Sequence, residues 1–263
     1  SALFSQTYKK WDLLILCDGS STPTFGHQIV SKLLDRIRLE KHRVKTLHNE
    51  QSQSVCAARQ KLLNEDNFNN QLILRMDDDC MPQNNYIEKL VEGIEKGYDL
   101  VSGVTPPMQT PETKRETKFI KPIVDEMQID EKGIITMYKD DCGYSYMTDE
   151  ILPLHHFRSC ALYKREMNLK YPYGVNWFRE ESFLSVQAIL KGYVLGIHTG
   201  AKVFHYMNST GGCRPQYTQQ IISIDQHNWE MWFKREFLRY KEKHGTNFLE
   251  DYNKKLKERG LIP

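Results

Sequence analysis

The chain has 263 residues, of which 40% are hydrophobic and 27% are charged. This balance is that of an ordinary globular protein, and it excludes disordered, collagen-like and coiled-coil chains. The formal net charge of +2 is too small for a protein that binds nucleic acid mainly through a basic surface. The longest apolar runs, such as residues 13–17, have the length of a strand, whereas a membrane span needs roughly 18 apolar residues.

Strands and helices are predicted to alternate along residues 13–104. A buried strand is expected where a short apolar run ends in polar turn residues, and a helix where apolar residues recur three and four positions apart. These rules predict strands at residues 13–17, 44–47, 72–76 and 100–104, and helices at residues 27–38, 55–63 and 86–94. Such alternation is typical of an α/β fold in which helices cover both faces of a mostly parallel sheet.

The pattern changes after residue 105. Residues 106–154 are polar and irregular, with one predicted hairpin at residues 129–138. Beyond them we predict strands at residues 160–163, 194–197 and 201–204, a helix at residues 180–190, and helices across residues 225–259 with a break at Gly245. The second part of the chain is therefore expected to complete one domain, with a binding region built by the polar insertion.

An acidic run, Asp77-Asp78-Asp79, stands at the carboxyl end of the predicted strand 72–76. In an extended segment, residues two apart point the same way, so Asp77 and Asp79 are expected to share a side. Carboxylates held that close repel each other, and a divalent cation that prefers oxygen ligands, Mg²⁺ or Mn²⁺, relieves the repulsion. The alternative is a solvated acidic turn that caps the following helix, and spacing alone leaves both interpretations open.

The six cysteines lie far apart and include no C-x-x-C pair. This spacing excludes zinc fingers and small disulfide scaffolds. Because the sequence also shows no signal peptide, we expect reduced thiols in a cytoplasmic protein. The first residue is Ser1 and not an initiator Met, so Ser1 is not taken as the natural start.

Several segments resemble motifs of glycosyltransferase family 2, in the family's order. They are Gln6-Thr7-Tyr8 with residues 11–20 (Q-T-Y, a strand, then D-D-G-S), residues 55–59 (A-A-R-N), residues 77–79 (D-x-D), residues 159–166 (the strand before the acceptor site), Glu180-Glu181 with Gly192-Tyr193 (E-D and G-Y), and residues 201–205 (A-x-V-x-H). The resemblance implies the Rossmann-like glycosyltransferase-A fold, an α/β fold with a mostly parallel central sheet, flanking helices and C-terminal helices. It also implies a catalytic domain over residues 1–210, with a nucleotide-binding half (1–105) and an acceptor-binding half (106–210), followed by a mobile loop and helical extension over residues 211–263.

The resemblance further implies a metal-dependent, inverting glycosyltransferase of the hexosyltransferase type. It would move a single sugar from a nucleotide-diphosphate sugar, with a UDP-sugar as the expected donor, to a hydroxyl of a glycan, a lipid-linked molecule or a protein. The residues implied are Asp18, Arg59, Asp77 and Asp78 for the donor; Asp77, Asp79 and His205 for Mn²⁺ or Mg²⁺; and Glu181 for the general base, with Glu180 as the second candidate. A glutamate that opens a helix is favoured in its ionised form by the helix dipole.

Four features depart from the family's pattern. Glu181 stands where the family has Asp, which keeps the carboxylate on a side chain one methylene longer. Cys17 replaces the first Asp of D-D-G-S, and we expect it to be a buried strand residue. The family's opening strand is not found before Ser1, and the Q-x-x-R-W motif of processive polysaccharide synthases is not found either. The absence of the Q-x-x-R-W motif favours an enzyme that adds single sugars.

Two other functions fit the same pattern. A nucleotidyltransferase shares the sheet, the nucleotide and the acidic metal site, but it needs a glycine-rich basic phosphate loop near the first strand, and the sequence shows none. A non-catalytic nucleotide-sugar-binding protein would keep the fold without turnover, and the exchange of Asp for Glu181 favours it. We favour the enzyme because the other expected site residues are all present: Asp18, Arg59, Asp77, Asp79 and His205.

The predicted C-terminal helix carries aromatic residues at helical spacing beside several basic residues. The aromatic residues are Trp229, Trp232, Phe233, Phe237 and Tyr240. Such a stripe packs against its own domain, against a second copy in a homodimer, or on a membrane surface. The stripe therefore leaves a homodimer and contact with the inner face of a membrane open. From its net charge and the lack of a signal peptide, the sequence predicts a cytoplasmic protein without nucleic-acid partners.

Overall fold

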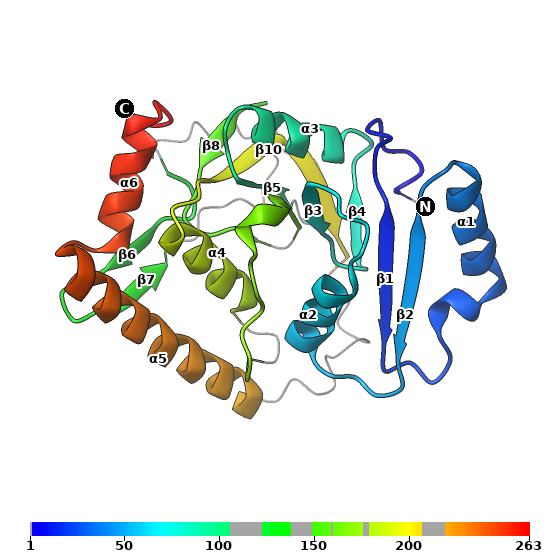
Figure 1. The fold of residues 1–263 in the computed structure, drawn as a ribbon, viewed down its shortest axis with the longest axis horizontal. Helices are drawn as coiled ribbons and strands as arrows, with labels where there is room; N and C mark the ends of the chain where they lie inside the picture. Colours follow the sequence, from blue (N-terminus) through cyan, green and yellow to red (C-terminus); the bar gives the residue numbers. More distant parts are fainter. Residues whose placement is uncertain (1, 106–122, 138–148, 159, 176–178, 207–218) are drawn as a thin grey trace.

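The structure is a computed structural model of the chain, and it describes every residue except 1, 106–122, 138–148, 159, 176–178 and 207–218 (Figure 1). Strands and helices alternate in the first part of the chain, as predicted, except that a short strand that was not predicted, β4, follows β3 directly. The elements there are β1 (Leu13–Asp18), the 3-10 helix η1 (Thr24–Gly26), α1 (Gln28–Leu39), β2 (Val44–Asn49), α2 (Val55–Glu65), β3 (Leu72–Arg75), β4 (Cys80–Pro82), α3 (Tyr86–Glu95) and β5 (Leu100–Val104).

The second part of the chain adds further strands and three helices to the described structure. Its elements are β6 (Met127–Ile129), β7 (Ile135–Met137), β8 (Ile151–Pro153), β9 (Ala161–Lys164), the 3-10 helix η2 (Arg165–Met167), α4 (Glu180–Leu190), β10 (Leu195–His205), α5 (Gln219–His244) and α6 (Phe248–Glu258). The predicted hairpin is present as the antiparallel pair β6–β7. The loop predicted to be mobile begins at residue 211, and residues 211–218 lie outside the described residues.

The described strands form one six-stranded sheet and two separate pairs, β1–β2 and β6–β7. The large sheet has the order β3-β9-β5-β10-β4, and β8 also pairs with β10. Within the described part of this sheet, β10 and β5 pair in parallel and the other pairs are antiparallel. The α/β fold class with a helix-flanked central sheet is confirmed, whereas the prediction that the sheet is mostly parallel is wrong.

The position of β9 explains this correction. β3 and β5 run in the same direction, as expected for a strand–helix–strand unit, because each is antiparallel to β9. β9 belongs to a later part of the chain and inserts between the two. Alternation along the sequence indicates the relative direction of β3 and β5, but it contains no sign that a later strand will separate them.

β10 is one long strand that leads from the core to the candidate site. Two strands were expected here, and the structure has one, with a shift of register between His198 and Lys202. The first part of β10 pairs with β5 and β8, and residues 203–205 pair with β4. β10 therefore places His205 directly opposite Cys80 of β4.

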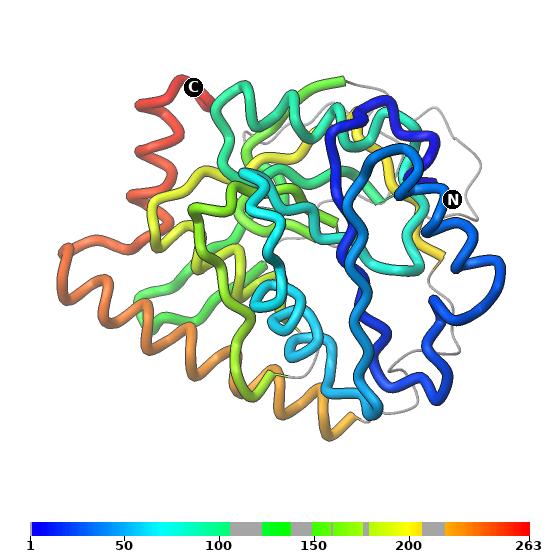
Figure 2. Tube along the Cα trace, turned by 45° about the vertical axis from the view of Figure 1, so that its right-hand side comes forward, coloured from blue at the N-terminus to red at the C-terminus, as the bar shows by residue number. Residues whose placement is uncertain are grey.

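β1, β2 and α1 lie at one end of the molecule, and the C-terminal helices α5 and α6 lie at the other end (Figure 1 and Figure 2). Of the aromatic residues on α5, Trp229, Phe233 and Phe237 are buried. The Trp229 ring lies 5.0 Å from that of Phe183 in α4, and the Phe233 ring lies 5.6 Å from that of Phe248 in α6, measured between centroids. This part of the stripe packs against its own domain. No described helix is both long and apolar enough to cross a bilayer.

Candidate active site

Asp18 is the last residue of β1, and polar groups from the end of β2 and the loop after it hold its carboxylate. The register of the β1–β2 pair places Asn49 opposite Asp18, and Asn49 Nδ2 donates to Asp18 Oδ1 at 2.6 Å. Ser52 Oγ donates to Asp18 Oδ2 at 2.9 Å, and the backbone N–H of Gln53 donates to the same oxygen at 3.1 Å. Asp18 is thus a fixed acceptor at the carboxyl ends of two parallel strands, which is where α/β sheets bind ligands.

Gly19 lets the chain turn directly after Asp18. Its φ is +85°, and a Cβ at this position would lie 2.5 Å from the backbone nitrogen of Ser52. Glycine alone accepts both the backbone conformation and the close approach. The glycine of the D-G-S segment is therefore what allows Ser52 to reach the Asp18 carboxylate.

Two arginines and three carboxylates form an ion cluster between α2, the end of β3 and the start of α4. Arg59 Nη1 lies 2.7 Å from Glu180 Oε1, and Arg59 Nη2 also donates to Asp77. Arg75 Nη2 lies 2.5 Å from Glu181 Oε1 and 3.3 Å from Glu180 Oε1. Four residues predicted for the site therefore meet here, although Arg59 and Glu180 are 121 positions apart in the sequence.

The pKa values of the two glutamates in this cluster shift in opposite directions. Burial, together with the negative charge of Glu181, raises the pKa of Glu180 above its usual range. Burial acts in the same direction on Glu181, but the guanidinium groups of Arg75 and Arg59 outweigh it and lower the pKa of Glu181. Glu181 is therefore ionised at neutral pH. Its side chain is 21% exposed, against 7% for that of Glu180, so Glu181 is the carboxylate that a substrate reaches more easily.

Arg75 is a site residue that the sequence analysis does not identify. It ends β3 and is 7% exposed, and its Nε and Nη1 have no hydrogen-bond partner among the described residues. A buried guanidinium is costly unless carboxylates surround it, and Glu180 and Glu181 supply them here. An arginine at the end of an apolar strand, directly before an acidic run, is the sequence signal that could have identified this pairing.

The acidic run forms a turn between β3 and β4 and does not extend β3. The extended geometry expected for Asp77 and Asp79 is therefore wrong, since alternation of side chains applies only to a strand. Asp77 contacts Arg59, whereas Asp79 Oδ2 lies 2.9 Å from His205 Nε2, and Asp78 is exposed. Joint metal binding by Asp77 and Asp79 stays a prediction.

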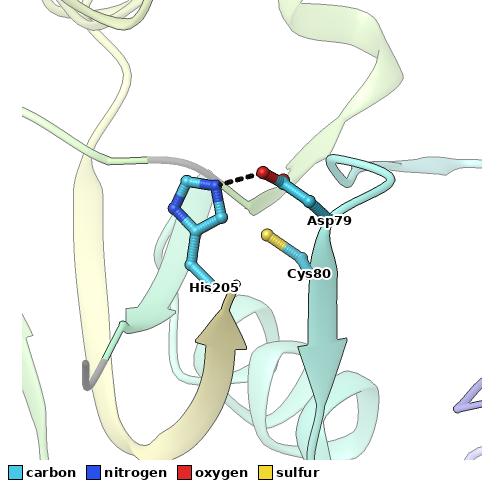
Figure 3. A group of neighbouring side chains, drawn as sticks. All are labelled: Asp79, Cys80 and His205. Carbon is cyan, nitrogen blue, oxygen red and sulfur yellow. Dashed lines mark hydrogen bonds and ion pairs between the residues drawn. The ribbon is translucent and has the colours of Figure 1, made fainter. Parts of the chain in front are cut away.

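Asp79, Cys80 and His205 form a group that could hold a metal ion, and Figure 3 shows their side chains gathered at the ends of β4 and β10. One carboxylate oxygen, the thiol sulfur and one imidazole nitrogen all lie within 4.8 Å of one another. Asp79 and His205 are two of the residues predicted for this role. Cys80 is an addition that the sequence analysis does not make, because the family's D-x-D pattern directs attention to the carboxylates alone.

A family model described as "Glycosyl transferase family 2" matches residues 1–171 of the chain. The chain belongs to this family. The matched residues of this glycosyl transferase family 2 member include Asp18, Arg59 and the acidic run, whereas Glu180, Glu181 and His205 lie beyond them. None of the curated protein sequences matches this chain.

The fold of this glycosyl transferase family 2 member is similar to that of two solved structures. One is GalNAc-T7 with UDP, GalNAc and Mn²⁺, with a TM-score of 0.57 and 14% identity over 98% of this chain and 51% of that chain. The other is S. aureus TarS 1-349, with a TM-score of 0.50 and 10% identity over 78% of this chain and 54% of that chain. The chain thus spans about half the length of these structures, and the likeness establishes the shared glycosyltransferase-A fold.

Proposed function

We propose that the chain transfers a single sugar from a UDP-sugar to an acceptor hydroxyl, with a divalent metal ion and with inversion at the anomeric carbon. The observation that carries the proposal is the ion cluster in which Asp77, Glu180 and Glu181 meet. Membership of glycosyl transferase family 2 supports transfer from a nucleotide sugar. The similar structure of GalNAc-T7, which holds UDP, GalNAc and Mn²⁺, supports UDP as the nucleotide and a divalent ion as the cofactor.

The donor nucleotide is proposed to lie across the carboxyl ends of β1 and β2. The Asp18 carboxylate, held in place by Asn49 and Ser52, suits the hydrogen-bond donors of a base or a ribose. Arg59 offers a planar fork of N–H donors, which suits phosphate or base oxygens. Asp78 is exposed on the turn after β3 and is proposed to contact the donor from that side.

Asp79 and His205 fit the divalent ion that the family resemblance implies. Carboxylate oxygen suits Mg²⁺ and Mn²⁺, and imidazole nitrogen can join it on the second of these ions. The side chains of Asp79 and His205 are 28% and 25% exposed, so an ion from solution can reach them. Asp77 is proposed to share its carboxylate between Arg59 and the ion. When bound, the ion would neutralise the charge that develops on the departing diphosphate.

Glu181 is proposed as the general base that takes the proton of the acceptor hydroxyl. Its carboxylate is ionised and partly exposed, and Arg75 fixes its position. Attack by the deprotonated hydroxyl on the face opposite to the departing diphosphate inverts the anomeric carbon. Glu180 is the second candidate, because its raised pKa makes it the stronger base although it is less exposed.

The acceptor is proposed to bind in a cavity of about 440 Å³ between the β6–β7 hairpin and α5. Arg179, which directly precedes Glu180, lines this cavity together with Met137 of β7 and Trp229 of α5. Small-molecule sites have volumes of roughly 300–1,000 Å³. The lining comes partly from residues 106–210 and partly from α5, and it suits part of a glycan, a lipid-linked acceptor or a protein segment.

One observation favours the non-catalytic alternative. Both candidate bases are paired with arginines, as in an ion cluster whose purpose is structural. A nucleotide-sugar-binding protein with this cluster would bind the donor and would not turn it over. The nucleotidyltransferase alternative lacks such support, since residues 19–27, which follow β1, contain no lysine or arginine to hold a phosphate chain.

A thermal-unfolding screen of UDP-, GDP-, CMP- and dTDP-sugars, each with Mn²⁺, Mg²⁺ or EDTA, tests the proposal. A ligand at about 100 times its Kd adds roughly 2.7 kcal/mol to the free energy of unfolding. We expect a rise in Tm with a UDP-sugar and Mn²⁺ that EDTA removes, and then release of UDP and an anomerically inverted product in acceptor reactions followed by NMR. Binding without UDP release would identify the non-catalytic alternative, and no shift with any donor would contradict both.

A further inference from the structure

We propose that Cys80 is a direct metal ligand, and that Asp79, Cys80 and His205 together bind a thiophilic divalent ion, Zn²⁺. The inference rests on the metal site of the proposed function. It gives Zn²⁺, in place of Mg²⁺ or Mn²⁺, as the ion that this site prefers. Carboxylate oxygens select Mg²⁺ or Mn²⁺, whereas a thiolate selects softer ions. The presence of the Cys80 sulfur beside Asp79 and His205 is the observation that favours Zn²⁺.

The three ligands are held by backbone pairing between two strands. Cys80 and His205 are cross-strand partners in the antiparallel pair β4–β10, so their side chains lie on the same face. The backbone N–H of Tyr206 donates to the carbonyl oxygen of Asp79 at 2.9 Å, which fixes Asp79 against the end of β10. Figure 3 shows the His205 ring aimed at the Asp79 carboxylate, with the Cys80 thiol beside both. The group is therefore built before any metal arrives.

The donor set matches the coordination chemistry of zinc. Zn²⁺ takes thiolate sulfur, imidazole nitrogen and carboxylate oxygen, and three protein ligands leave a fourth position for water or a substrate oxygen. Mg²⁺ instead demands near-octahedral oxygen coordination and keeps several waters. Because Zn²⁺ and the ion of the proposed reaction would share Asp79 and His205, they would compete. Zn²⁺ is therefore expected to displace that ion and to inhibit transfer.

Cys80 is also accessible, unlike the other described cysteines. Cys17, Cys56 and Cys160 are buried, whereas Cys80 is half-buried. Cys80 is thus partly open to solvent, as are Asp79 and His205. Among the cysteines that the structure describes, Cys80 is the one placed to bind a metal.

Titration of the full chain with Co²⁺, in the absence of nucleotide and acceptor, tests the assignment. A thiolate bound to Co²⁺ gives a sulfur-to-cobalt charge-transfer band in the near ultraviolet, and excess Zn²⁺ should abolish it by displacing Co²⁺. We expect the band in the wild type and in the control variant Cys17→Ser, and its loss in Cys80→Ser. Zn²⁺ affinity in Cys80→Ser should fall by at least the roughly 10- to 100-fold that loss of an outer-shell partner costs.

A band of full strength in Cys80→Ser, or no band in the wild type, would overturn the proposal. Neither result depends on sugar transfer, so failure of the proposed function is detected separately. A second measurement uses the wild type alone and does not require a folded variant. Zn²⁺ should slow the alkylation of Cys80 by iodoacetamide, followed peptide by peptide in a mass spectrometer, and equal rates with and without Zn²⁺ would contradict the assignment.

Discussion

The candidate site has two ends, one at Asp18 and the other at Glu180 and Glu181, and the protein holds them in different ways. β1, which ends in Asp18, has five partly exposed residues out of six, whereas all five residues of β5 are buried. The β1–β2 pair is separate from the large sheet, which contains β3 and, at its end, Arg75, the ion-pair partner of Glu181. Segments with few buried apolar contacts open at lower free energy than the core. We infer that the β1–β2 pair, the proposed donor end, opens more readily than the end that carries the carboxylates.

Polar contacts also hold the donor end. Gln6 is fully buried, its Nε2 donates to the carbonyl oxygen of Gln83 at 2.8 Å, and its Oε1 accepts from the backbone N–H of Ile87 at 3.1 Å. These bonds attach the segment before β1 to the start of α3. The glutamine of the Q-T-Y segment is therefore an anchor between the two regions.

The largest expected effect separates the functions of the two ends. Glu181→Gln removes the proposed base, so sugar transfer should fall by about 10²–10⁴-fold, the usual contribution of general base catalysis. The rise in Tm with the donor should be unchanged, because Asp18 and its partners are untouched. The control is Glu95→Gln, the same change at an exposed glutamate of α3. Transfer at the wild-type rate would show that Glu181 is not the base.

A matched pair of leucines tests the difference in packing. Leu100 of β5 is fully buried, and Leu100→Ala should lower the free energy of unfolding by about 2–5 kcal/mol through loss of contacts and a cavity. Leu14 of β1 is half-buried, so Leu14→Ala should cost less. Urea unfolding of both variants measures the difference, and equal losses would refute the contrast between the two strands.

Gln6→Ala should loosen the donor end in particular. The change leaves the buried N–H of Ile87 without its side-chain partner, at a cost of about 1–3 kcal/mol. Hydrogen exchange should accelerate in β1 and β2 more than in β5. Gln28→Ala, at an exposed position of α1, is the control. Uniform acceleration across all strands would indicate that Gln6 supports the whole fold and not this junction.

The smallest effect concerns acid stability at the donor end. Burial acts to raise the pKa of Asp12, but hydrogen bonds from Arg43 and Asn70 outweigh it and lower the pKa to about 2. Because the folded-state pKa lies below the ordinary value of 3.8, the ionised carboxylate stabilises the fold above about pH 4, and this contribution is lost as the pH falls toward 2. The gap in urea midpoint between wild type and Asp12→Asn should shrink over this interval. A constant gap would contradict the assignment.

The sequence was sufficient for most of the helices and strands, because these depend on local patterns. Apolar periodicity predicted the strands and helices before β5 except η1 and β4, and motif order indicated Asp18, Arg59 and Glu181, whose roles stay predictions. The insertion of β9 between β3 and β5 could not be predicted, since strand pairing depends on contacts between distant parts of the chain.

The same reason explains the residues that were missed. Arg75 and Cys80 gain their importance from partners more than a hundred positions away, Glu181 and His205 respectively. Asp77 and Asp79 are close in sequence but face different partners, because the chain turns between them. The spacing of two residues in the sequence predicts which way their side chains point only where the backbone has a regular conformation, as in a strand.

The ion cluster has a consequence for the engineering of this family. Arg59, Arg75 and Asp77 come from residues 1–105, whereas Glu180 and Glu181 come from residues 106–210, so most of the ion pairs cross that boundary. A chimera that joins residues 1–105 of this chain to the second half of a relative without the two glutamates would leave Arg59 and Arg75 without these partners. A buried charge left without its partner costs about 3–5 kcal/mol. Exchange of donor and acceptor specificities by recombination should therefore succeed when these five residues are transferred as a set.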